Sequence, residues 1–88
     1  MPDLEIPDQF KRIVDGKEAP LVAAIAKCVS LLGSNPRHPG LQTHPVRGTH
    51  NPKVFEAYVD KKNRVTFHWH EGRIVLRNNC NHEILKRP

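Results

Sequence analysis

The sequence predicts a small α+β domain in which two helices precede an antiparallel sheet. Apolar residues recur at helical spacing over residues 4–32, a loop rich in proline and glycine follows over 33–53, and apolar and polar residues alternate over 54–82. Because 88 residues are too few for two separate cores, residues 1–88 are expected to form a single domain. We therefore expect an N-terminal helical hairpin packed on one face of a three- to four-stranded antiparallel sheet.

The helical part opens with a short apolar segment, Leu4–Ile6, which could form a brief edge strand. Pro7 suits the first turn of a helix, where its missing N–H costs nothing, and Gly16 is expected to end that helix. A second helix is predicted to begin near Pro20, and the run Gly33, Ser34, Asn35 and Pro36 is expected to end it. The apolar residues of this second helix share one face: Leu21, Ile25, Cys28, Val29 and Leu32.

The last third of the chain has the alternation of half-buried strands. Asp60–Asn63 and Glu71–Gly72 are predicted to be hairpin turns, so that three strands follow one another as a meander. One face of the sheet should be covered by the helices and belong to the core, with Phe55, Val59, Val65, Phe67 and Trp69. The opposite face should be open to a ligand and display Tyr58, Arg64, Thr66 and His68.

The charge of the chain points to a polyanionic partner. It has 14 Lys and Arg against 9 Asp and Glu, a net charge of +5 and a pI of about 9.6, which suits nucleic acid, although a plainly solvated basic surface is the alternative. Cys28 and Cys80 lie far apart and suggest no disulfide framework. Without a membrane-length apolar stretch or a signal-peptide pattern, the expected location is the cytoplasm, with no membrane partner.

A family resemblance lies in residues 31–85. The segment LLGSNPRHPGLQTHPVRG contains the run Leu41-Gln-Thr-His44-Pro45-Val46-Arg47-Gly48, and the strands that follow contain NRVTF, IVL and NHEIL in that order. This arrangement resembles the toxins of the RelE/ParE superfamily from bacterial toxin–antitoxin systems. In that family a similar H-P-L-x-G run precedes a strand-opening Arg, an apolar third strand and a His just after it.

The resemblance implies a RelE-like fold and the activity of an mRNA interferase. Such a toxin is an endoribonuclease that cleaves mRNA, is expected to act at the ribosome, inhibits translation and is held in check by an antitoxin protein. It needs no metal or other cofactor. Members of the ParE branch, which are similar in fold, instead poison DNA gyrase. The histidine and arginine content of this chain favours the RNA-cleaving branch.

Metal-free RNA cleavage requires an acid, a base and positive charge on the phosphate, roles that suit histidine and arginine. By their match to the family, we predict the catalytic residues to be His82, Arg64 and His44. The predicted substrate-binding residues are Arg47, Tyr58, His68 and Arg77. Glu56 is a further possible base, but a cross-strand pair with Arg64 would explain it equally well.

Other functions stay open on the sequence alone. A zinc site could use His68, His70, Cys80 and His82, although their spacing lacks the usual zinc-module signatures. A basic nucleic-acid-binding module without catalysis, or a gyrase-poisoning homologue, would use the same basic face. The non-catalytic reading is favoured by Leu85 and Lys86, which stand where many family members have an aromatic residue.

Overall fold

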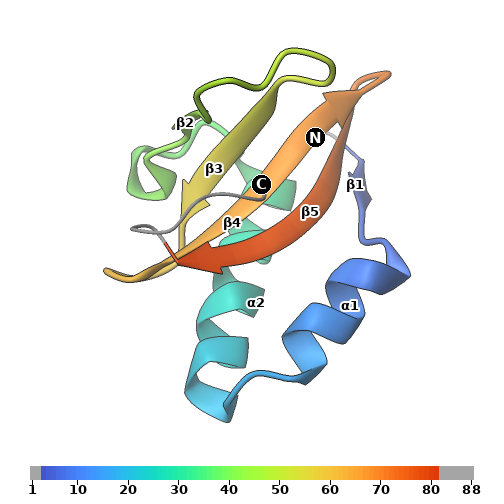
Figure 1. Ribbon diagram of the computed structural model, residues 1–88. Helices are drawn as coiled ribbons and strands as arrows, with labels where there is room; N and C mark the ends of the chain where they lie inside the picture. The colour runs from blue at the N-terminus through green and yellow to red at the C-terminus, as the bar shows by residue number, and fades with distance from the viewer. Residues whose placement is uncertain (1–2, 82–88) are drawn as a thin grey trace.

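The computed structural model describes residues 3–81, which form two helices and one five-stranded sheet (Figure 1). The elements in chain order are β1 Leu4–Glu5, α1 Asp8–Asp15, α2 Ala19–Ser34, the short 3-10 helix η1 Pro39–Leu41, β2 His44–Pro45, β3 Val54–Tyr58, β4 Asn63–His70 and β5 Arg73–Asn81. The strands lie side by side in the order β1-β5-β4-β3-β2. The predicted α+β order of helices, loop and strands is confirmed.

The sheet has one strand more than the three to four that the sequence predicted. The brief edge strand expected at Leu4–Ile6 is present as β1, and β2 adds a second edge strand of two residues. β2 pairs antiparallel with β3, whereas β1 runs parallel to β5, with Leu4 opposite Ile74. The purely antiparallel sheet expected from the meander is therefore corrected to a mixed one. Two-residue pairings are too short to produce a detectable period of two, which is why β2 was read as loop.

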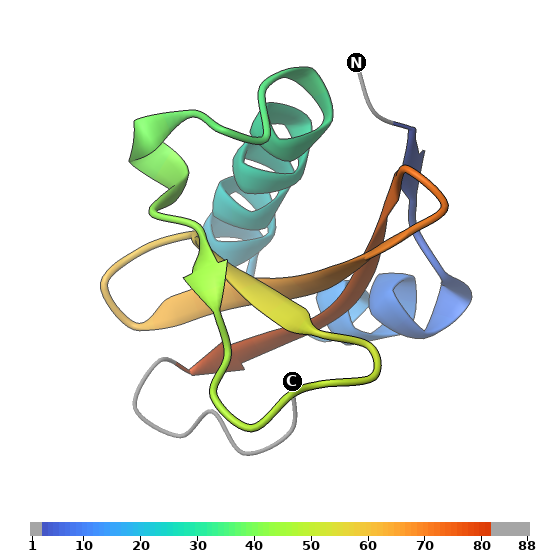
Figure 2. The ribbon, with the colours of Figure 1, turned by 90° about the horizontal axis from the view of Figure 1, so that it is seen from above.

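The helices begin and end where the sequence predicts. Pro7 directly precedes α1, Gly16 caps its end, and Pro20 lies in the first turn of α2. Figure 2 shows α2 on one side of the sheet, while α1 lies beside β5, its main contact. Within residues 3–81, neither helix has the length and apolar character needed to cross a bilayer.

The core lies between α2 and the predicted apolar face of the sheet. Its buried members are Phe10, Ile25, Cys28, Leu32, Leu41, Ala57, Val65, Phe67, Ile74 and Leu76. Burying each of the larger side chains stabilises the fold by roughly 1.5–3 kcal/mol. Trp69 is a correction, because it lies on the predicted face but is 43% exposed. The loop after α2, rather than a helix, stands opposite this end of the sheet, so the indole is covered only in part.

Both predicted hairpin turns are present. In the β3–β4 turn, the Asp60 carboxylate accepts hydrogen bonds from the amides of Lys62 (2.9 Å) and Asn63 (2.8 Å). Burial alone would raise the pKa of Asp60, but hydrogen bonds from Asn63 and the two amides, together with the Arg64 charge, lower it. The β4–β5 turn consists of Glu71 and Gly72, with φ of 50° and 78°, as a tight two-residue hairpin loop requires.

A β-bulge interrupts the pairing of β4 with β5. Thr66 lies opposite Asn78 and Phe67 opposite Leu76, so Arg77 is the extra residue on β5. A bulge turns side chains away from the regular alternation of a strand. Here the extra residue is Arg77, and its side chain contacts His68 on β4.

Candidate functional site

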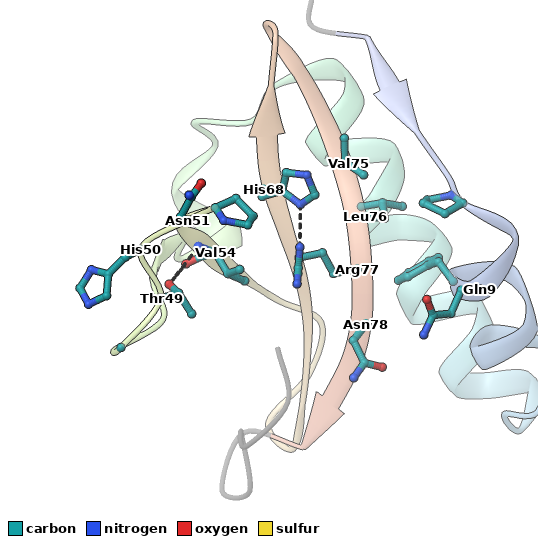
Figure 3. Close-up of a pocket in the computed structure, with 14 residues that line it drawn as sticks. Gln9, Thr49, His50, Asn51, Val54, His68, Val75, Leu76, Arg77 and Asn78 are labelled. Atoms are coloured by element: carbon teal, nitrogen blue, oxygen red, sulfur yellow. Dashed lines mark hydrogen bonds between the residues drawn. The ribbon is translucent and has the colours of Figure 1, made fainter.

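An open groove of about 990 Å³ lies on the face of the sheet opposite α2 (Figure 3). Its floor comes from β4 and β5, including His68, Arg77 and Asn78. One wall is the start of α1, with Gln9, and the other is the loop of residues 48–52. The groove is therefore built by the start of α1, the 48–52 loop and the β4–β5 hairpin. Two of the predicted substrate-binding residues, His68 and Arg77, meet in its floor.

Arg77 and His68 form the polar centre of the groove, with Nη1 of the arginine 3.0 Å from Nδ1 of the histidine. A guanidinium can only donate, so Nδ1 accepts and the neutral imidazole carries its proton on Nε2. Burial lowers the pKa of His68, and the charges of Arg77 and His70 lower it further, while Glu5 raises it. The pair therefore combines a fixed positive charge with a neutral ring that donates a hydrogen bond from Nε2.

The wall loop is held by Thr49. Its hydroxyl donates to the carbonyl of Val46 (2.8 Å) and accepts from the amide of Val54 (2.9 Å), which ties the loop to the start of β3. The loop carries His50 to the outer side of the groove (Figure 3). Sequence reasoning assigned His50 no role in the site. It missed Gln9 and Asn78. Gln9 reaches the groove through the position of α1 and Asn78 follows the bulge in β5, and neither feature can be recognised from a pattern in the sequence.

A second polar cluster on the same face joins His44 of β2 to Glu56 of β3, which lie directly opposite each other. Nδ1 of His44 is 2.8 Å from the carbonyl oxygen of Gln42 and must donate to it, because a carbonyl only accepts. Nε2 is 2.5 Å from Oε1 of Glu56, which is the distance of a hydrogen-bonded pair. Both ring nitrogens of His44 are thus engaged.

Glu56 is the buried member of this pair. Its side chain is 3% exposed, against 52% for His44. The cross-strand pair with Arg64 that the sequence suggested is not what the register produces, since Thr66 lies opposite Glu56 and Tyr58 lies opposite Arg64. Glu56 and Thr66 are buried, so the face expected to be open is closed in its middle.

Arg64 lies on the predicted face but is only 9% exposed. Its Nη1 donates to the carbonyls of Asp60 (2.5 Å) and Asn63 (2.9 Å), and the guanidinium carbon lies 4.8 Å from the centre of the Tyr58 ring. These contacts hold the β3–β4 turn. Tyr58 is half-buried beneath the guanidinium, so in this arrangement both residues serve packing.

The predicted site residues fall in successive rows across one face of the sheet. His68 and Arg77 lie in the groove, the His44–Glu56 pair lies in the next row, and Tyr58 with Arg64 lies nearest the β3–β4 turn. Arg47 is exposed on the loop after β2. His82 lies outside the described residues, so its predicted role stays a prediction.

The zinc alternative has little to support it in the part of the chain that the structure describes. Within residues 3–81, no three side chains of His, Cys, Asp or Glu gather to hold a metal ion. His70 lies 3.9 Å from Glu71, and His68 contacts Arg77. The other two candidate ligands were Cys80, whose side chain is not described, and His82, which lies outside the described range.

The fold is that of the RelE-type toxins of toxin–antitoxin systems. No protein-family model and no curated protein matches the sequence. Among solved structures, YafQ from Escherichia coli strain BL21(DE3) superposes with a TM-score of 0.74 at 15% identity, over 99% of this chain and 100% of that one. A chain of the archaeal RelE–RelB complex from Pyrococcus horikoshii OT3 gives 0.71 at 13% identity, over 94% and 97%.

A third similar structure is the YoeB/ParE toxin from Agrobacterium tumefaciens, with a TM-score of 0.68 at 13% identity, over 91% of this chain and 98% of that one. The similarity in each case covers nearly the whole of both chains. The RelE-like fold predicted from the resemblance of residues 31–85 is therefore confirmed.

Proposed function

We propose that this protein is the toxin of a toxin–antitoxin system and an endoribonuclease that cleaves mRNA. The observation that carries the proposal is the Arg77–His68 pair in the floor of a groove, on a basic domain with the RelE-type toxin fold. An arginine fixed beside a neutral histidine supplies charge and a hydrogen-bond donor at one point, which is what a phosphodiester needs.

In the proposed reaction the RNA provides its own nucleophile. The 2′-oxygen forms a bond to phosphorus as the bond to the 5′-oxygen breaks, leaving a cyclic 2′,3′-phosphate and a new 5′-hydroxyl. Arg77 binds the phosphate oxygens and stabilises the negative charge that develops on them. His68 donates from Nε2 to a phosphate oxygen. Arg47, exposed on the neighbouring loop, binds the RNA backbone outside the groove.

The proton transfers are assigned by the chemistry of each residue. His82 is proposed as the acid that protonates the leaving 5′-oxygen, in keeping with the resemblance. Both nitrogens of His44 are engaged in this structure. We propose that its bond to Glu56 opens when RNA binds, and that Nε2 then acts as the base that takes the proton of the 2′-hydroxyl. Arg64 and Tyr58 are assigned to holding the β3–β4 turn.

The proposed partners are an antitoxin protein, mRNA and the ribosome. Similar structures were solved as the DinJ–YafQ and RelE–RelB complexes. We propose that this chain likewise pairs with a small protein. A net charge of +5 suits an acidic segment of such a partner, which would compete with RNA for the same basic surface.

The test is induced expression in bacteria of the wild type and of two single variants, Arg77→Ala and His82→Ala. Arg12→Ala, which removes the same charge from an exposed position of α1, is the control. We expect growth arrest and new 5′ ends in primer extension on a reporter message from the wild type and the control. Both should be lost in the other two variants. Arrest with intact message would instead indicate a gyrase poison, and no arrest from folded protein would contradict the toxin function.

A further inference from the structure

A second cleft, of about 510 Å³, lies on the other face of the sheet, beside the loop that follows α2. Its floor is aromatic. The rings of Phe55 and Phe67 stack at 5.8 Å between centres, and Trp69 meets Phe67 edge to face at 6.5 Å. Phe67 is buried, but Trp69 is 43% exposed and is the single tryptophan of the chain. The cleft therefore presents the ring of Trp69 to whatever enters it.

Local hydrogen bonds hold the wall of the cleft in place. His38 accepts a hydrogen bond from the Gly40 amide on Nδ1 (2.9 Å), and its carbonyl accepts from the amide of Leu41 (3.0 Å), whose side chain is buried in the core. Because Nδ1 accepts, the neutral ring of His38 carries its proton on Nε2. A preformed wall lowers the ordering cost of binding a ligand.

The rim of the cleft is polar, and no carboxylate lines it within the part of the chain that the structure describes. Arg37, Gln42 and Thr43 line it, and within residues 3–81 their side chains make no hydrogen bond or ion pair. An arginine suits a phosphate, and an amide with a hydroxyl suits the edge of a base. An exposed indole is a platform on which a base of any identity can stack.

We propose that this cleft binds one nucleotide of single-stranded RNA, with the base on Trp69 and the phosphate on Arg37. The inference rests on the proposed function for the kind of substrate, and it adds a subsite outside the groove. A protein partner fits the cleft less well, because the anchoring pockets of protein interfaces are desolvated at their centre. Here hydrogen-bonding side chains surround the aromatic floor.

The chain itself connects the two sites. Thr43 lines the cleft, Thr49 lines the groove, and the segment between them follows the β2 edge of the sheet (Figure 2). Arg47 is exposed on this segment. An RNA strand that follows the segment would pass a cation between the cleft and the groove, which is the arrangement that a continuous binding track requires.

The experiment uses an octamer of 2′-O-methyl RNA, which lacks the nucleophile and is not cleaved. Titration should quench the emission of Trp69 through base stacking. Arg37→Ala should weaken binding and reduce the slope of log affinity against log salt by about 1, as expected for one lost phosphate contact. Trp69→Leu should weaken binding roughly tenfold, whereas Trp69→Phe retains most of the affinity. Arg12→Ala is the charge-matched control, and melting curves check that each variant folds.

The groove variant Arg77→Ala separates the two proposals. If Arg77→Ala weakens binding while Arg37→Ala behaves like Arg12→Ala and Trp69 is not quenched, the subsite is overturned and the RNA-binding groove stands. If Arg37→Ala and Trp69→Leu weaken binding and Arg77→Ala does not, the subsite stands without the groove. Absence of octamer binding by the wild type overturns the subsite and leaves a protein partner as the occupant to test.

Discussion

His44 and Glu56 face each other across β2 and β3 with 2.5 Å between Nε2 and Oε1. The strand β2 has only two residues, so few backbone hydrogen bonds attach it to the sheet. The His44–Glu56 pair supplements them and gives a buried carboxyl group a hydrogen-bonding partner. This contact therefore contributes to the sheet edge whether or not His44 takes part in a reaction.

Replacing His44 with Ala should destabilise the fold by about 1–3 kcal/mol, because the buried carboxyl group of Glu56 loses this partner. Because the imidazole is half-exposed, the expected loss of stability is smaller than that for breaking a fully buried pair. Urea denaturation of the wild type, His44→Ala, Glu56→Gln and the double variant forms a complete cycle. A double variant as unstable as the sum of the two single ones would mean that the pair contributes no coupling energy.

Arg64→Ala should destabilise the protein by about 1–3 kcal/mol, because two hydrogen bonds to turn carbonyls and the contact with Tyr58 are lost. Lys62→Ala, at an exposed position of the same turn, is the control and should stay within about 0.5 kcal/mol of the wild type. Thermal unfolding followed by circular dichroism measures both. Unchanged stability of Arg64→Ala together with lost RNA cleavage would favour the phosphate-binding role predicted from the sequence.

The sequence predicted the elements that have strong local signals. Pro7, Gly16 and Pro20 marked the helix ends, and Asp60 and Gly72 marked the two hairpin turns. Each of these residues acts through its own backbone geometry or through a bond to a nearby amide. Such effects can be read without knowing the rest of the fold.

The site was harder to predict because it depends on register. Alternation placed His68 and Arg64 on one face correctly, but it could not show that the guanidinium of Arg64 turns back to its own hairpin. The bulge that brings Arg77 to His68 has no sequence signature in this strand. The exposure of Trp69 depends on the position of the loop after α2, which is distant in sequence. The alternation of apolar and polar residues in a strand gives no information about the position of such a loop.

Cys28 should be chemically inert in the folded protein. Burial raises the pKa of its thiol to about 11, so almost no thiolate forms near neutral pH. In a Cys80→Ser background, DTNB should label Cys28 only in urea. Because the folded pKa lies above the unfolded one, the contribution of Cys28 to stability is complete below pH 9 and declines as the pH rises towards 11. Rapid labelling under native conditions at pH 7 would contradict its burial.

Arg77→Leu should raise the pKa of His68, because the charge that helps to lower it is removed along with the hydrogen bond to Nδ1. An NMR titration of the imidazole signals would measure the change, with Arg12→Leu as the control that leaves the groove intact. The folded pKa of His68 is depressed, so its contribution to stability is present above the unfolded pKa and is lost as the pH falls through the folded one. The wild type should therefore lose more stability than Arg77→Leu on acidification from neutral pH. An equal loss in both proteins, with an unchanged pKa, would mean that Arg77 does not control the protonation of His68.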